Sequence, residues 1–257
     1  RQISNFSKDL DMISEQLFKL KTYGSVENCG AVLQDGIDNL QWNQNQDAIK
    51  IIFIAGNENF TQGKVDYKNA CANAVRKGII INTIYCGDCE QGVKEFWKDG
   101  ADGGKGYYSC INTNAQEVYI ESPYDDVILK YNDSLNTTYI NYVDKVILEK
   151  KKAEGYSASE AISMNNYSKS NQTTQDFNAG SFSKGTMVNR TVSKSNSSLY
   201  VANDWDLVTN AMNNQVDWNT IEKKSLPIEY QNFSIEELKR IVEIKNRDRK
   251  RFEKAII

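Results

Sequence analysis

The feature that most constrains the fold is a short apolar run at residues 49 to 57, which reads Ile-Lys-Ile-Ile-Phe-Ile-Ala-Gly-Asn. It is rich in β-branched residues and stops at Gly-Asn, a pattern typical of a buried parallel strand that opens into a loop. In open α/β sheets, ligands bind beyond the carboxyl ends of the strands. We therefore expect Asn57, Glu58 and Asn59 to lie where recognition would occur.

A second strand is predicted from Ile79 to Tyr85, after a helical segment that ends in Arg76-Lys77-Gly78. Basic residues in the last turn and Gly at the C-cap are typical of a helix end, so this stretch predicts one βαβ unit. Apolar periodicity predicts further helices near residues 7–20, 33–42, 93–97 and 124–142, and a third strand at 107–111. The fold class is thus α/β with a three-layer parallel sheet, although a doubly wound sheet usually has about five or six strands.

Several motifs follow one another along the chain: residues 23–33 (YGSVENCGAVL), 54–57 (IAGN), 78–87 (GIIINTIYCG), and the aromatic pairs at 96–97 and 107–108. In this order they resemble von Willebrand factor A (VWA) domains, closest to the bacterial subgroup with a C-terminal extension. The likeness resumes at residues 203–208 (NDWDLV) and 226–227 (LP), before a charged final helix. The resemblance implies a sheet of VWA (Rossmann-like) type.

The resemblance also implies a degenerate metal site. VWA domains begin with a strand that ends in Asp-x-Ser-x-Ser and supplies most of the metal-ion-dependent adhesion site (MIDAS), and no such motif precedes Ser25. We therefore expect an N-terminally truncated domain that lacks the family's first strand, first helix and next two strands. Ser25 matches the family's metal-binding Thr, and Asn57 matches its Asp, so a neutral amide replaces a carboxylate ligand of Mg²⁺. We expect no cofactor and an empty site, with Mg²⁺ binding only if N-terminal residues complete it; the simpler interpretation is that both residues are caps or turns.

The composition excludes several classes of function. The chain of 257 residues has 31 basic and 34 acidic side chains, which gives no electrostatic case for binding nucleic acid. It has no apolar run near the ~20 residues that cross a bilayer, so we expect no transmembrane segment. It contains no histidine, which excludes Ser-His-Asp and Cys-His catalysis. We therefore expect a protein that is not an enzyme.

The cysteines suggest the main alternative function, which is thiol-disulfide chemistry. Cys86 and Cys89 form a C-x-x-C pair at a predicted strand-to-helix junction, a setting in which a thiol pKa falls and redox chemistry occurs. Cys86 also ends a strand that should lie beside the strand carrying Cys110, so one of the pair can form a disulfide with Cys110 if the Cα atoms come within ~7 Å. Cys71 is expected to be a small core residue or a disulfide partner. A bridge would favour an oxidising compartment.

Three regions are predicted along the chain: a VWA-like domain over residues 1–145, an extended Ser/Asn-rich linker over 146–200, and a helical C-terminal extension over 201–257. Almost half of the residues from 156 to 200 are Ser, Asn or Thr, a composition that is poor in apolar surface to bury. The final helix is predicted from the capping box at Ser234 and Glu237.

These expectations lead to one function and two alternatives. We expect a non-enzymatic VWA-type interaction or adhesion module that binds protein partners in a larger assembly. Its expected location is a bacterial cell envelope, either periplasmic or at the cell surface, and the alternative location is the cytoplasm. The alternatives are a thiol-disulfide oxidoreductase that uses Cys86 and Cys89, and a structural subunit with no ligand. Because the family's neighbouring strand is missing, we also expect the strand edge at Ile51 and Phe53 to need a cover.

Overall fold

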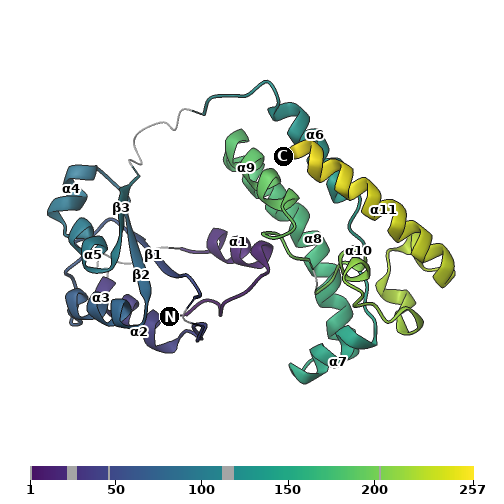
Figure 1. Cartoon of the computed structure of the whole chain (residues 1–257), viewed down its shortest axis with the longest axis horizontal. Coiled ribbons are helices and arrows are strands. Elements are labelled where there is room, and N and C mark those ends of the chain that lie inside the picture. Colours follow the sequence, from purple (N-terminus) through teal and green to yellow (C-terminus); the bar gives the residue numbers. More distant parts are fainter. Residues whose placement is uncertain (1, 22–27, 46, 112–118, 203) are drawn as a thin grey trace. The chain divides into compact units, whose positions relative to one another are not determined.

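The computed structural model describes residues 2–21, 28–45, 47–111, 119–202 and 204–257, which form two compact units. The sheet unit consists of Arg1–Phe6 and Lys21–Val118, and the helical unit of Ser7–Leu20 and Tyr119–Ile257 (Figure 1). Residues 7–20 therefore belong with the C-terminal half of the chain. This division differs from the predicted one, which kept residues 1–145 together.

Three parallel strands form the sheet: β1 (Lys50–Gly56), β2 (Ile79–Tyr85) and β3 (Lys105–Cys110). Their order is β1-β2-β3, so β2 lies in the middle. The predicted α/β class and the first βαβ unit are confirmed, but among the described residues the sheet unit has two layers and not the predicted three, because its helices pack on one face of the sheet. The third strand begins two residues earlier than predicted, at Lys105, and the β2 to β3 pairing is irregular between Ile81 and Thr83.

In the part of the chain that the structure describes, the sheet unit contains the helices α2 (Cys29–Asn39), α3 (Tyr67–Arg76), α4 (Cys89–Lys94) and α5 (Trp97–Gly103). The side chain of Asp66 caps α3 by accepting the backbone N–H of Lys68. A single short helix was predicted at residues 93–97, but two helices meet there. Phe96 has a left-handed backbone with φ of 66°, which ends one helix and starts the next.

An aromatic cluster joins these helices to one face of the sheet. Trp97 is fully buried, with its ring centroid 4.8 Å from that of Phe60 and 5.8 Å from that of Tyr85, both in edge-to-face geometry. Its indole N–H donates to the carbonyl oxygen of Glu58 at 2.8 Å, and its own carbonyl accepts the hydroxyl of Thr83 at 2.7 Å. Satisfied polar groups allow this large side chain to be buried without penalty.

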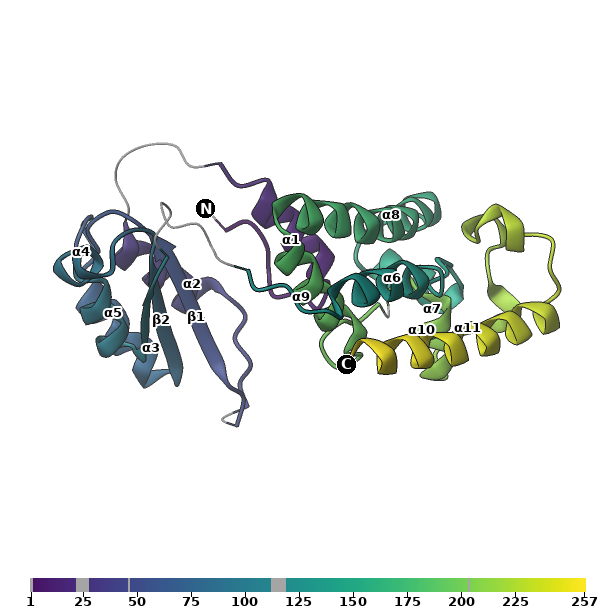
Figure 2. The same cartoon turned by 90° about the horizontal axis from the view of Figure 1, so that it is seen from above.

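The helical unit contains the remaining helices: α1 (Leu10–Phe18), α6 (Asp125–Asn136), α7 (Lys145–Ala153), α8 (Ala158–Phe182), α9 (Lys184–Ser195), α10 (Leu207–Met212) and α11 (Ile235–Ile256). Three short 3₁₀ turns lie at Trp218–Thr220, Lys223–Ser225 and Ile228–Tyr230. Helices α1, α7 and α9 pack on α8, and α6 packs on α9 and α11 (Figures 1 and 2). The capping box predicted at Ser234 and Glu237 starts α11.

The prediction of an extended linker at residues 146–200 is wrong, because α7, α8 and α9 occupy most of it. Helix α8 starts with a capping box formed by Ser157 and Glu160. Its buried side chains are mostly polar, and they pair with one another and with neighbouring helices and loops: Asn165, Asn171, Gln172, Gln175 and Asp176. The buried face of α8 is therefore stabilised by hydrogen bonds and ion pairs, because its sequence has too few apolar residues to form an apolar stripe.

Helix α11 is fixed by a buried arginine. The guanidinium of Arg249 donates to Asp206 at 2.8 Å and to the Thr138 hydroxyl and carbonyl at 2.9 and 2.8 Å. It also stacks over the Tyr139 ring, with Cζ 4.1 Å from the centroid. In the described part of the chain, no helix is both long enough and apolar enough to span a bilayer.

Candidate functional site

The carboxyl ends of the strands form one edge of the sheet, as predicted. Gly56 pairs with Tyr85, and Tyr85 pairs with Cys110, so the three strands end side by side. Asn57 and Cys86 follow β1 and β2 directly and therefore lie at this edge. Asn57 is exposed there.

The predicted metal site combines Ser25 with Asn57. Ser25 lies outside the described residues, so the pairing of the two remains a prediction. Among the residues that the structure describes, no group of three or more His, Cys, Asp or Glu side chains is arranged to hold a metal ion. In the loop after Asn57, the Asn59 side chain accepts the backbone N–H of Thr61 at 2.9 Å, which is a turn role typical of Asn.

A disulfide joins Cys89, at the start of α4, to Cys110, at the end of β3, with the Cα atoms 5.3 Å apart. This is one of the two pairings that the sequence left open for Cys110. The C-x-x-C residues are therefore not bonded to each other. Asp88 caps α4 by accepting the N–H groups of Glu90 and Gln91 at 3.0 and 2.9 Å, which places Cys89 in the first turn.

The remaining cysteines differ in exposure. Cys71 is buried, and its thiol donates to the Gly100 carbonyl at 3.4 Å. Burial, followed by the negative charge of Asp99, raises the pKa of Cys71 to about 11, so the thiolate is scarce at neutral pH. Cys29 is also buried, whereas Cys86 is partly exposed. Cys71 therefore acts as a core residue, and Cys86 is the more accessible thiol.

One face of the sheet is uncovered within the described part of the sheet unit. The helices pack on the face that carries Ile52, Ile54, Ile79, Ile81 and Tyr85. The opposite face exposes large apolar side chains from all three strands: Ile51, Phe53, Ile80 and Tyr107. Phe53 is 67% exposed and Tyr107 is 84% exposed. Along β1 and β3, burial alternates from one residue to the next, as expected for a sheet with one covered face.

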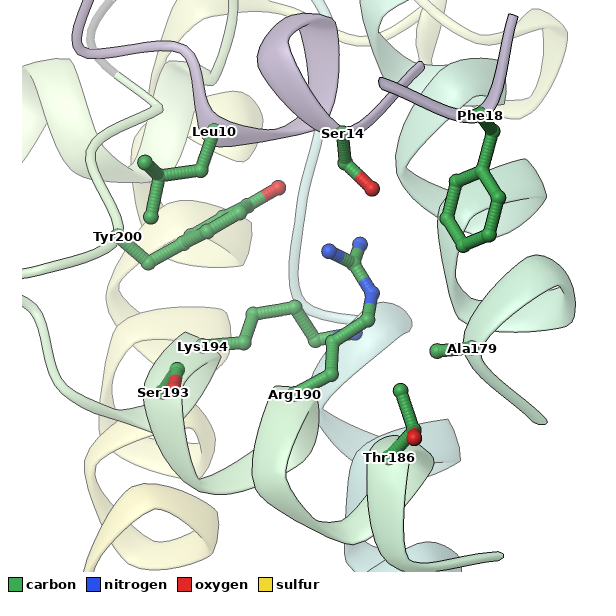
Figure 3. A pocket seen from close by; sticks show the side chains of 9 residues that line it. All are labelled: Leu10, Ser14, Phe18, Ala179, Thr186, Arg190, Ser193, Lys194 and Tyr200. Carbon is green, nitrogen blue, oxygen red and sulfur yellow. The ribbon is translucent and has the colours of Figure 1, made fainter. Parts of the chain in front are cut away.

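A second feature lies in the helical unit and was not predicted. Asp11 of α1 and Asp176 of α8 both accept hydrogen bonds from the Arg190 guanidinium, at 2.6 and 2.7 Å. Asp176 also pairs with the buried Lys194 ammonium at 2.6 Å, and the Tyr200 hydroxyl donates to Asp11. Figure 3 shows that Arg190, Lys194 and Tyr200 line a pocket beside α1.

Sequence reasoning missed this cluster because its members are far apart in the chain. Asp11 and Arg190 are separated by 179 positions, and neither has a neighbour in sequence that marks it as buried. The capping box at Ser157 and Glu160 was the available signal, since it marks the start of α8 and hence a helical role for the polar segment.

Comparison with known proteins adds no relationship. No protein-family model, no curated protein and no solved structure matches the chain.

Proposed function

We propose that the chain is a non-enzymatic protein-interaction module of the VWA type, part of a larger assembly in a bacterial cell envelope. The partner we propose is a protein that adds a β-strand beside β1 and covers the uncovered sheet face. The single observation that carries this proposal is the combination of an edge strand, β1, with the exposed side chains of Ile51 and Phe53.

Physical reasoning favours a partner at this surface. Parallel sheets are normally covered on both faces, and a contiguous exposed apolar face is typical of an interaction site. An edge strand presents unpaired N–H and C=O groups, to which an extended segment can bond. Strand addition of this kind gives affinity through the backbone and specificity through alternate side chains. A partner strand beside β1 would satisfy the edge, and another part of the same partner would cover the face.

Two further observations support the assignment. Three of the motifs that resemble the VWA family, at residues 54–57, 78–87 and 107–108, include parts of the parallel strands β1, β2 and β3, and Asn57 follows β1 at the carboxyl edge of the sheet, which is where the resemblance would put the family's metal. We propose that this metal site is degenerate. The disulfide between Cys89 and Cys110 supports an oxidising location such as the envelope.

Self-association tests the proposal, because a second copy can stand in for the partner strand. Sedimentation velocity of the wild-type chain should show association that rises with concentration, and Phe53→Lys should shift the protein to monomer. Phe177→Lys is the matched control, since Phe177 is 73% exposed on α8 of the helical unit. A wild-type protein that stays monomeric at every concentration, with slow amide exchange at Ile51 and Phe53, would contradict the proposal.

A further inference from the structure

The pocket beside α1 in the helical unit has a volume of about 240 Å³. Leu10, Ser14 and Phe18 of α1 form one wall, at a four-residue spacing that places them on one face of the helix. Ala179 of α8 and Arg190 of α9 lie opposite (Figure 3). The wall is mainly apolar, and Figure 3 shows the Arg190 guanidinium and the Ser14 hydroxyl pointing toward the middle of the space.

Arg190 brings unused hydrogen-bond donors to this pocket. A guanidinium has five N–H donors. The Nε of Arg190 donates to Asp176, and its Nη2 donates to Asp11 and to the Gln172 carbonyl. Its Nη1 has no hydrogen-bond partner among the described residues, although the side chain is only 14% exposed. An acceptor placed in the pocket can bond to this donor, which faces the pocket.

The charges around the pocket indicate whether the acceptor atom of a ligand should be charged or neutral. Arg190 and Lys194 are matched by Asp11 and Asp176, so the cluster has two cations and two anions. An anionic ligand would therefore meet no uncompensated positive charge, and it would lie close to the Asp11 carboxylate. A neutral carbonyl or amide oxygen can bond to Nη1 without this cost.

We propose that this pocket binds a small neutral molecule with an apolar body and one carbonyl or amide oxygen. The oxygen accepts from Nη1 of Arg190, and the apolar body lies among Leu10, Phe18 and Ala179. The size is suitable, because an apolar cavity of about 150 Å³ can hold one benzene molecule. The ligand would contact α1 and α9 together, so its binding would also hold α1 in place.

Three probes of similar shape test the chemistry on the full chain: benzamide, benzoate and toluene. Titrations followed by amide chemical shifts should show benzamide binding, with shifts at Ser14, Ala179 and Arg190. Toluene should bind about tenfold more weakly because it cannot accept from Nη1. Benzoate should also bind at least about tenfold more weakly than benzamide, because its charge has no partner.

Two variants test separately the contribution of the pocket volume and the contribution of the Arg190 Nη1 donor to binding. Ala179→Leu fills the pocket without changing a charge and should weaken benzamide at least about tenfold. The matched control is Ala158→Leu, an exposed position on the same helix, which should bind as wild type does. Arg190→Lys keeps a positive charge beside Asp11 and Asp176 but lacks Nη1, so it should weaken benzamide about tenfold and leave toluene within about twofold.

The proposal is overturned if benzamide causes no shift at the pocket residues, or if Ala179→Leu binds benzamide as wild type does. Tighter binding of benzoate than of benzamide would overturn the assignment of a neutral ligand. If Arg190→Lys does not fold, Ala179→Leu and its control still decide whether the pocket is the site.

Discussion

Asp176 lies at the centre of the polar cluster formed by α1, α6, α8 and α9 in the helical unit. Its carboxylate accepts hydrogen bonds from Asn132 and Asn136 at 3.0 and 2.7 Å, and from Arg190 and Lys194. Burial by itself raises the pKa of Asp176, but the charges of Lys194 and Arg190 outweigh burial and hold the pKa below its usual value. The ionised form is therefore the one that stabilises the fold.

The pH dependence of stability follows from this direction. In the unfolded chain an Asp titrates near pH ~3.9, and in the folded chain Asp176 titrates lower. Its contribution is therefore complete above pH ~3.9 and is lost as the pH falls through the folded pKa. Asp176→Asn leaves the buried Lys194 without its carboxylate and leaves Arg190 paired with Asp11 alone, so it should cost about 3 kcal/mol at pH 7.

Urea unfolding at pH 7, 5 and 3 measures this prediction. The difference between wild type and Asp176→Asn should be large at pH 7 and 5 and smaller at pH 3. Asp133→Asn, at an exposed position of α6, is the control and should stay within about 0.5 kcal/mol of wild type. An equal difference at all three pH values would show that the charge of Asp176 is not what stabilises the unit.

At the scale of single elements, apolar runs made the strands predictable. The β1 and β2 runs are rich in Ile, and both strands were placed within a residue or two of their observed bounds. Helix α8 was not predicted, because its buried face carries amide and charged side chains. A hydropathy pattern detects only the spacing of apolar residues, so it does not detect this face. Only the partners of those side chains, most of them far away in the sequence, show that the face is buried.

Helix α2 offers a test of packing with two glycines on one element. A Cβ at Gly30 would overlap the backbone carbonyl oxygen of Val65, whereas the nearest atom to a Cβ at Gly36 is Leu40 Cδ1 at 3.9 Å. Gly30→Ala should therefore destabilise the sheet unit by about 1–3 kcal/mol. Gly36→Ala should be neutral or stabilise it by about 0.5–1 kcal/mol, because Ala favours helix.

Chemical denaturation of the two glycine variants measures this difference. The two substitutions add the same methyl group to the same helix. Helix propensity alone would therefore change the free energy of unfolding in the same direction for both variants. Equal stabilities for Gly30→Ala and Gly36→Ala would mean that the α2 contact with the Val65 loop is looser than the structure describes.

At the scale of the whole molecule, the candidate sites differ in how far sequence could predict them. Asn57 follows a strand end, and a general rule for parallel sheets placed it correctly at the sheet edge. The pocket at Arg190 depends on α1, which belongs to the helical unit although the sheet unit follows it in the chain. A long-range assembly of this kind leaves no local pattern, since each helix alone reads as an ordinary polar helix.

The two units have separate cores, and this makes their stabilities separable. The sheet unit is built around Trp97 and Phe60, and the helical unit around apolar clusters that include Leu238 and Leu135. A core of its own is the usual requirement for a cooperative unfolding unit. We therefore expect calorimetry of the full chain to show two transitions.

The variant Arg249→Met tests which of the two unfolding transitions belongs to which unit. The guanidinium of Arg249 is paired with Asp206, whose side chain is fully buried, so removing it leaves an uncompensated charge and should cost on the order of 3–5 kcal/mol. This variant should lower only the transition of the helical unit, whereas Gly30→Ala should lower only that of the sheet unit. A single transition that both variants lower together would mean that the two cores unfold as one cooperative body, and the division of the chain into independent units would then be wrong.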